Sequence, residues 1–473
     1  MRLDPVDMAG LRRTVAGWGG LEQAELSLHR VEAGPDALHA LPAILEELLP
    51  TGSRTVLITQ DRRPFTRDGA SLKPLVAELV AAAGFEVEVL ELGDQDGRME
   101  SDFAEVDQVR RRLAPGRAVV ALGSGKLCDV TKHACHLQEQ RDRRHLGLVV
   151  LQTANSVIAF GSGMATITKD GVKRTWPSRL PDALVLDERT LREAPSAYTL
   201  GGIGDLAVIA VSFGDWYLAA EFGLSRYTPA AFEVLGDVRE QLLSPERAAA
   251  LGAGGLDGAE LLGKLAVLGG FAMTLAGQSS PMSGYEHAVS HMLDMCARPS
   301  GRPVRSHGCQ CGISTIVCAI AWQRLLQDLR PDKVDLDTLF PAPDAVEPRV
   351  RATFDALDPS GAMAEECWRS YRGKLVAWHG RPPPRRGLPP RLARAPGPPG
   401  PAGRPPPRSS SRAWPWPTIR SATRTSAPPR HRPGGRSGTA TSCAAGSARP
   451  TCSASWAGWT TTWSTRSSPT TGS

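Results

Sequence analysis

The fold of this chain is decided by one stretch, residues 118–137, which reads AVVALGSGKLCDVTKHACHL. An apolar run ends at Leu122, Gly123-Ser124-Gly125 follows, and a helical pattern comes next. Small residues at such a strand-to-helix turn let backbone N–H groups and the helix N-terminus approach a pyrophosphate. The turn is not a complete G-x-G-x-x-G motif, so by itself it is weak evidence. It nevertheless predicts a nucleotide-binding strand–turn–helix unit.

Similar strands lie on both sides of this unit. Between about residues 54 and 190, apolar β-branched runs alternate with helical patterns, which is typical of a parallel sheet covered on both faces. The runs are 56–59, 87–92, 118–122, 148–152 and 183–186. Asp170-Gly171 between two further strand-like runs predicts a β-hairpin, because both turn positions need positive φ. We therefore expect a Rossmann-like, nucleotide-binding α/β domain with an inserted β-hairpin over residues 1–195.

After about residue 196 the apolar residues are spaced by three and four, as in helices. The segments with this spacing are 205–220, 259–276, 284–296 and 311–327. No strand-like run recurs among them. We expect an all-helical domain for metal and substrate over residues 196–378, and an active site in the cleft between the two domains.

Residues 379–473 differ sharply in composition from the rest. They hold 19 of the 39 Pro and no carboxylate side chain. Such a segment cannot bury enough apolar surface to offset chain entropy, so we predict a disordered Arg/Pro/Ser-rich tail. It is either an interaction arm or the product of a frameshift near residue 380. We favour the frameshift, because an out-of-frame reading of GC-rich DNA yields this mixture.

Charge, hydropathy and cysteine content exclude several classes of protein. The tail's 15 Arg leave 40 basic against 49 acidic side chains in residues 1–380, a net charge of about −9, so no nucleic-acid partner is expected. No apolar run approaches the length of a signal peptide or a membrane span, so we expect a cytoplasmic protein without a membrane partner. Cys309 and Cys311 beside His307 are compatible with a thiolate zinc site. No second Cys pair has finger-like spacing, and ordinary buried cysteines are the preferred interpretation.

Two segments carry residues whose roles are ambiguous when each is taken alone. Asp129 and Lys132 lie one helical turn apart, a spacing that favours a solvated ion pair. Asp205 follows three glycines within residues 201–204 and fits a helix N-cap best.

Three histidines lie close together further along the chain. His287 and His291 stand at i and i+4, so both imidazoles can converge on a metal or a substrate. His307 follows about twenty residues later. The spacing is suggestive of a site without deciding its chemistry.

Together these segments resemble one superfamily, the iron-containing alcohol dehydrogenases and dehydroquinate synthase-like enzymes, nearest to the glycerol-1-phosphate dehydrogenase and glycerol dehydrogenase branches. The resemblance covers roughly residues 25–375. The family's G-G-G-K-x-x-D-x-x-K appears as Gly123-Ser124-Gly125-Lys126, Asp129 and Lys132. The ordered set G-x-G-D, E-H-x-x-S-H and H-G matches the metal-binding positions, and a set of this kind is more specific than any single motif.

The resemblance implies a role for each matching residue. Asp205, His287 and His307 would bind one divalent metal, Zn²⁺, Fe²⁺ or Ni²⁺. The residues on the side of the cofactor, NAD or NADP, would be Gly123, Ser124, Gly125, Lys126, Asp129, Lys132, Thr153 and, as an adenosine-ribose contact, Asp61. Catalytic roles would fall to Lys132 and to His291, the latter as a substrate contact or proton relay, with a supporting role for His291 equally compatible. The sequence departs from the family at Ile158, where relatives carry a substrate-facing Asp.

The implied function is a metal-dependent, NAD(P)-linked oxidoreductase that interconverts a small polyol or polyol phosphate and its ketone, and a homo-oligomer is compatible with it. The metal would act as a Lewis acid, and the nicotinamide would carry the hydride. One alternative is a sugar-phosphate cyclase like dehydroquinate synthase, a lyase. The spacing of His287 and His291 fits the cyclase, but cyclases carry Glu where Asp205 stands. Another alternative is a catalytically degenerate relative.

Overall fold

A computed structural model describes residues 3–18, 27–95, 99–244, 246, 251, 256–297, 299–328, 330 and 333–380. The predicted disordered tail lies outside the described residues from position 381 onward. An N-terminal helix, α1 (Met8–Gly17), precedes the first strand.

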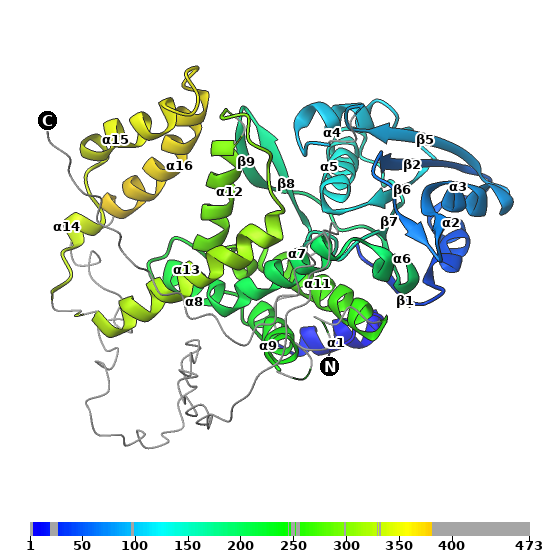
Figure 1. Cartoon of the computed structure of the whole chain (residues 1–473), viewed down its shortest axis with the longest axis horizontal. Helices are drawn as coiled ribbons and strands as arrows, with labels where there is room; N and C mark the ends of the chain where they lie inside the picture. The colour runs from blue at the N-terminus through cyan, green and yellow to red at the C-terminus, as the bar shows by residue number, and fades with distance from the viewer. Residues whose placement is uncertain are drawn as a thin grey trace, which may run out of the picture. The chain divides into compact units, whose positions relative to one another are not determined.

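Six parallel strands form the central sheet of the N-terminal half (Figure 1). In spatial order they are β1 (Arg30–Gly34), β10 (Ala183–Asp187), β7 (Leu148–Gln152), β6 (Ala118–Gly123), β2 (Thr55–Asp61) and β5 (Glu86–Leu92). All five predicted runs are strands of this sheet. Sequence analysis missed β1, because this edge strand buries only Val31 and so lacks the continuous apolar run of a central strand.

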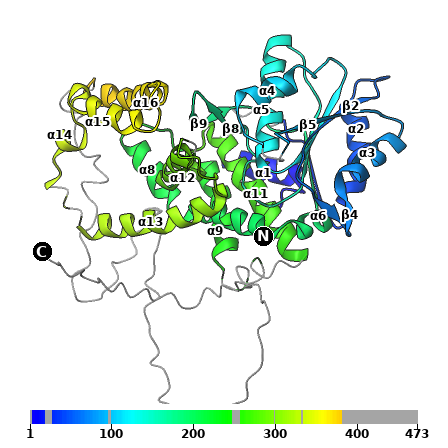
Figure 2. The same cartoon turned by 45° about the horizontal axis from the view of Figure 1, so that its top comes forward.

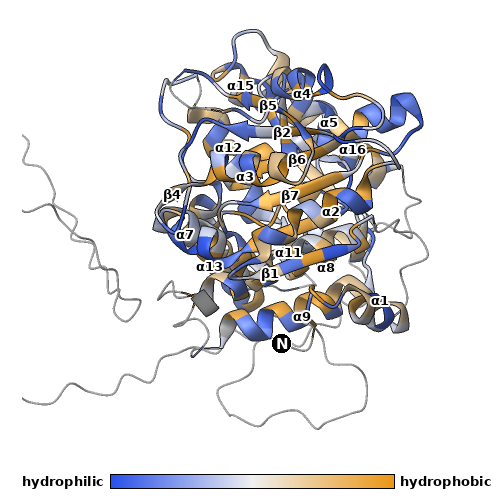
Figure 3. Ribbon diagram, turned by 90° about the vertical axis from the view of Figure 1, so that its right-hand side faces the viewer, coloured by the Kyte–Doolittle hydropathy of each residue, from blue (hydrophilic) through white to orange (hydrophobic). Residues whose placement is uncertain are grey.

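Helices cover both faces of the sheet, which gives two separate cores. Alternate residues of a strand point to opposite faces. Leu57 of β2 packs in one core with α4 (Phe103–Arg110) and α5 (Gly125–Asp142), whereas Val56 and Ile58 pack in the other with α2 (Leu41–Leu48) and α3 (Leu72–Ala82). Figure 3 shows β6 and β7 mainly in the hydrophobic colour, as expected for strands buried on both sides. The predicted α/β architecture is therefore confirmed.

The predicted hairpin is also present. Strands β8 (Met164–Lys169) and β9 (Val172–Pro177) pair antiparallel, with Lys169 opposite Val172. Both turn residues have positive φ, 50° at Asp170 and 78° at Gly171. The hairpin lies between β7 and β10 in the chain, although these two strands pair directly in the sheet. A second hairpin, of the two-residue strands β3 (Thr66–Arg67) and β4 (Ala70–Ser71), follows β2.

All described elements after β10 are helices, as predicted (Figures 1 and 2). The helices are α6 (Glu188–Glu193), α7 (Ser196–Ala207), α8 (Ser212–Glu221), α9 (Pro229–Leu243), α11 (Leu256–Ala276), α12 (Tyr285–Ala297), α13 (His307–Asp328), α14 (Leu336–Leu339), α15 (Pro343–Asp355) and α16 (Ala362–His379). After β10, no strand occurs among the residues that the structure describes.

Helices α7 and α13 approach each other through glycines. A Cβ added at Gly308 would lie 1.9 Å from the carbonyl oxygen of Gly201, and one added at Gly204 would lie 2.2 Å from that of Gly308. Any side chain at these positions would push the two helices apart. The contact brings the end of α7, with Asp205, against the start of α13, with His307.

Three helical stretches contradict the expectation that no segment has the length and hydropathy of a membrane span. By length and composition alone, Ser196–Glu221, Gly258–Ala276 and His307–Asp328 qualify. The most apolar windows of the first two are 56% and 72% buried inside the fold, so much of their hydropathy is explained by packing against other helices. The third is 33% buried, and its exposed large apolar residues are Ile313, Ile316, Val317, Ile320 and Leu325.

Candidate functional site

A cavity opens beside the N-terminus of α5, with about 700 Å³ between the atoms when the solvent at its mouth is counted. Its lining includes residues predicted for the cofactor and residues predicted for the metal. These are Gly125, Lys126 and Asp129, and Asp205, His287 and His307. The residues predicted for the cofactor and those predicted for the metal therefore line the same cavity.

Asp205 is a buried residue in the last turn of α7, so its interpretation as a helix N-cap is wrong. Its Oδ2 accepts a 2.9 Å hydrogen bond from the backbone N–H of Ile158. Its Oδ1 accepts no hydrogen bond and lies 3.5 Å from Nε2 of His287 and 3.8 Å from Nε2 of His307. An unpaired buried carboxylate oxygen is costly, and a cation is the partner that offsets this cost best.

His287, in the first turn of α12, is oriented by the residue before it. Its Nδ1 lies 3.0 Å from Oε1 of Glu286, a fully buried carboxylate that also accepts a 2.7 Å hydrogen bond from the backbone of Gly284. This contact leaves Nε2 to face Asp205. Burial would lower the pKa of His287, but Cys311 and Asp205 raise it well above its usual value. A carboxylate behind an imidazole is the usual support of a metal-binding histidine.

His307, the first residue of α13, is oriented by a chain of hydrogen bonds. Gln310 donates from its amide nitrogen to Asp294 (3.0 Å), so its Oε1 is free to accept from the hydroxyl of Ser290 (2.8 Å). Because that hydroxyl has only one hydrogen, Ser290 accepts from Nδ1 of His307 (2.9 Å). Nε2 of His307 therefore carries the lone pair and faces Asp205. Burial and Lys173 hold the pKa of His307 well below its usual value, which keeps the ring neutral.

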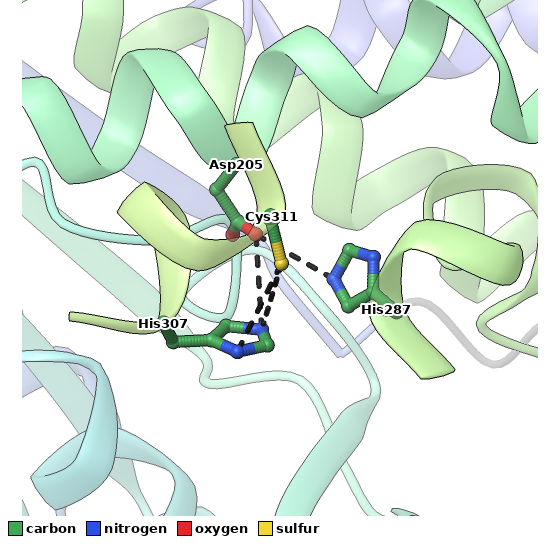
Figure 4. Close-up of side chains that lie close together, drawn as sticks. All are labelled: Asp205, His287, His307 and Cys311. Atoms are coloured by element: carbon green, nitrogen blue, oxygen red, sulfur yellow. Dashed lines mark hydrogen bonds and ion pairs between the residues drawn. The ribbon is translucent and has the colours of Figure 1, made fainter. Parts of the chain in front are cut away.

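The four side chains Asp205, His287, His307 and Cys311 converge (Figure 4). Each offers one ligand atom, and these atoms lie within 4.8 Å of one another. Ligand atoms about 2.0–2.1 Å from a tetrahedral ion lie roughly 3.4 Å apart, so the 3.5 and 3.8 Å separations around Asp205 fit a divalent cation. The three sequence-predicted ligands are brought together, and a thiol joins them.

His291 lies next to this group without belonging to it. Its ring centroid is 6.1 Å from that of His287 and 5.6 Å from that of His307. Burial, Lys173 and His287 hold its pKa well below the usual value. The i and i+4 spacing thus places His291 beside the metal residues as a neutral side chain.

The predicted glycine turn is present at the carboxyl end of β6. Gly123 ends the strand, Ser124 is the N-cap of α5, and Gly125 begins the helix. A Cβ on Gly125 would lie 2.2 Å from Cγ2 of Val157, so only glycine allows the loop after β7 to approach the turn this closely. Lys126 faces the cavity and donates to the carbonyl oxygen of Met99 (3.1 Å).

Asp129 and Lys132 form a buried pair, so the solvated ion pair expected from their spacing is wrong. Lys132 Nζ lies 3.3 Å from Asp129 Oδ1 and donates to three carbonyl oxygens, those of Ala159 (2.7 Å), Ser162 (2.8 Å) and Met164 (2.8 Å). Its side chain is fully buried. All three ammonium hydrogens are engaged, which ties α5 to the loop between β7 and β8.

Thr153 and Asp61 follow the same edge of the sheet but do not line the cavity. Thr153 is buried after β7, and its backbone N–H donates to the carbonyl oxygen of Gly123 (3.2 Å). Asp61, at the end of β2, accepts from the backbone of Arg63 (3.1 Å) and forms an ion pair with Lys73 at 2.9 Å. The carboxylate predicted to contact a ribose is thus already paired within the chain.

Comparison with known proteins shows which proteins the chain is similar to. A family model described as iron-containing alcohol dehydrogenase matches residues 32–195. A glycerol-1-phosphate dehydrogenase [NAD(P)+] of Halalkalibacterium halodurans is 28% identical over 306 residues, 64% of this chain and 73% of that protein. One from Methanothrix thermoacetophila is 27% identical over 314 residues, 66% and 80% of the two chains. The solved glycerol dehydrogenase of Schizosaccharomyces pombe is 18% identical, with a TM-score of 0.48 over 79% of this chain and 98% of that one.

Residues 32–195, the greater part of the α/β half, are thus similar to the iron-containing alcohol dehydrogenase family. The resemblance inferred from the ordered motifs is thereby confirmed. The departure at Ile158 has a structural consequence. Its side chain lines the cavity without offering a carboxylate at this position, while its backbone N–H holds Asp205.

Sequence reasoning gave no role to three residues that shape the site. Glu286 and Ser290 orient the two histidines, and both stand in the quoted motif E-H-x-x-S-H, which was the available signal. Lys173, on β9, reaches the cavity and forms an ion pair with Asp294 at 2.8 Å. No local signal indicated Lys173, because the hairpin fold alone brings it there.

Proposed function

We propose that this chain is a metal-dependent, NAD(P)-linked dehydrogenase that interconverts a small polyol or polyol phosphate and its ketone. The observation that carries the proposal is the convergence of Asp205, His287 and His307 in the cavity that also contains the glycine turn of α5. The relatives named as glycerol-1-phosphate dehydrogenases [NAD(P)+] support the same substrate class and cofactor.

Asp205, His287 and His307 would together bind the metal. Asp205 would contribute its unpaired Oδ1, and the two histidines their Nε2 atoms, each fixed by a partner on the opposite ring nitrogen. A bound Zn²⁺, Fe²⁺ or Ni²⁺ would supply Lewis-acid polarisation of the substrate oxygen. Because each histidine ring is held by a partner of its own, metal binding would require little reorganisation of the two rings.

The glycine turn would hold the cofactor's pyrophosphate at the N-terminus of α5, where backbone N–H groups are available. A nicotinamide cofactor would supply the hydride chemistry. Gly125 and Lys126 are the residues of this turn that face the cavity. For Lys132, we propose a positioning role, because its ammonium binds carbonyl oxygens of residues that line the cavity.

Substrate recognition would combine charge with an apolar wall. Lys126 and Lys173 line the cavity and offer positive charge to a phosphate. Ile158, Met273 and Met282 line it as well and exclude water from the reacting carbon. His291 is the candidate for a substrate or proton contact, because it lies beside both metal-binding rings.

The test uses the full-length chain loaded in turn with each of the three metals. NADH and NADPH oxidation is followed by absorbance with dihydroxyacetone phosphate and with dihydroxyacetone. We expect metal-dependent oxidation, larger with the phosphate. His307→Ala should abolish metal retention by elemental analysis while circular dichroism shows an intact fold. Phosphate release without net loss of NADH would favour the cyclase, and no turnover with any metal would favour the degenerate relative.

A cytoplasmic location and a homo-oligomeric assembly are further parts of the proposal. Cell fractionation tests the first, and light scattering of the purified chain tests the second. A monomer at assay concentration would contradict the proposed assembly without affecting the proposed chemistry.

A further inference from the structure

We propose that Cys311 is a fourth protein ligand of the metal centre, bound through its sulfur as a thiolate. The inference rests on the proposed metal site and deepens it. It reverses the interpretation of Cys311 as an ordinary buried cysteine.

The position of the sulfur fits a ligand. Cys311 lies one helical turn after His307 on α13, so both side chains are on the same face of the helix. Its Sγ is 3.6 Å from Nε2 of His307. With metal–sulfur and metal–nitrogen distances of about 2.3 and 2.0–2.1 Å, tetrahedral geometry places the two ligand atoms roughly 3.5 Å apart.

Two further side chains lie close to the sulfur of Cys311. The ligand atoms of Asp205 and His287 lie within 4.8 Å of the sulfur and of each other. Figure 4 shows the Cys311 side chain directed toward the space that Asp205, His287 and His307 surround. Oδ1 of the buried Asp205 accepts no hydrogen bond and lies within this group, which independently favours a cation there.

Charge balance favours the thiolate. Cys311 is fully buried, and Asp205 is 1% exposed. With Asp205 as the only anionic ligand, a divalent cation would leave its own ligand set with a net positive charge, and burial makes such a charge costly. Binding of the metal with loss of the thiol proton to solvent forms the metal–sulfur bond and brings the ligand set to neutrality.

A thiolate ligand has a consequence for metal choice. Soft sulfur ligands favour Zn²⁺ over hard cations such as Mn²⁺ and Mg²⁺, which prefer oxygen. Cys309 provides a matched control. It lies two residues earlier on α13, is partly exposed, and does not belong to the ligand group.

The experiment replaces the metal of the full-length chain with Co²⁺ and records the near-ultraviolet spectrum, where thiolate-to-cobalt charge transfer absorbs. We expect the band in the unmodified chain and in Cys309→Ser, and its loss in Cys311→Ser at saturating Co²⁺. X-ray absorption of the zinc form should show one sulfur at about 2.3 Å. This second measurement decides the question if Cys311→Ser does not fold.

Two outcomes overturn the inference. One is a chain that holds stoichiometric Co²⁺ without the charge-transfer band, which leaves the metal site intact and removes only the thiolate. The other is a band that persists in Cys311→Ser. A chain that binds no Co²⁺ at all, measured by elemental analysis, overturns the proposed function together with the inference.

Discussion

Replacing Lys132 with Met separates a structural role from a catalytic one. Met is similar in length and fills the same buried space, but it removes the ammonium. The three carbonyl oxygens of Ala159, Ser162 and Met164 lose their donor, and the buried carboxylate of Asp129 loses its counter-ion. We expect a loss of stability even though a metal and a cofactor are absent from the assay.

The magnitude follows from the burial of the pair. Lys132 is fully buried and Asp129 is 6% exposed. Removing one partner of a buried ion pair costs about 3–5 kcal/mol, because the other charge is left uncompensated. The double variant Lys132→Met/Asp129→Asn should lose less of the free energy of unfolding than Lys132→Met alone. It removes that charge, while the amide that replaces the carboxylate keeps an oxygen for the backbone N–H of Thr166.

Urea unfolding followed by tryptophan fluorescence measures the change. The matched control is Lys126→Met on the same helix, whose side chain is 46% exposed and pairs with Glu100 at 3.5 Å. This control should change the free energy of unfolding by less than about 1 kcal/mol. If Lys132→Met unfolds at the same urea concentration as the unmodified chain yet loses activity, the positioning role is wrong and the catalytic role returns.

Three further predictions concern pH, metal affinity and helix packing. Burial lowers the pKa of His133 to about 4, below the value of about 6.5 for the unfolded chain. The folded protein therefore loses stability as the pH falls from about 6.5 toward 4, by up to about 3 kcal/mol. His133→Phe should remove this part of the pH dependence of the urea midpoint, and an equal fall in both proteins contradicts the assignment. Glu286→Gln should weaken Zn²⁺ binding ~10–100-fold in a chelator competition, and unchanged affinity excludes an orienting role. Gly308→Ala should lower both the melting temperature and the metal affinity, because its Cβ would clash with Gly201. Gly373→Ala is the control: its Cβ would meet open space on α16, so it should stabilise the protein by up to about 1 kcal/mol. Identical melting temperatures for the two alanine variants would show that α7 and α13 tolerate separation.

Local pattern was enough to predict much of the fold. Strands buried on both faces appear as continuous apolar runs, so the central strands β2, β6, β7 and β10 were predictable. Asp170-Gly171 likewise predicted the hairpin, because only a few residue types adopt positive φ at both turn positions. Edge strand β1 has no such pattern and was missed.

The sequence by itself determined which residue types could form the site, through the ordered motifs that contain Asp205, His287 and His307. The tertiary structure alone decided how they are used. The glycine contact between α7 and α13 brings Asp205 beside His307, and the rotation of α13 about its axis turns Cys311, and not Cys309, toward them. The loop after β7 buries Lys132, which spacing alone had suggested was solvated. Spacing along a helix shows which side chains share a face, but only packing between elements determines what that face meets.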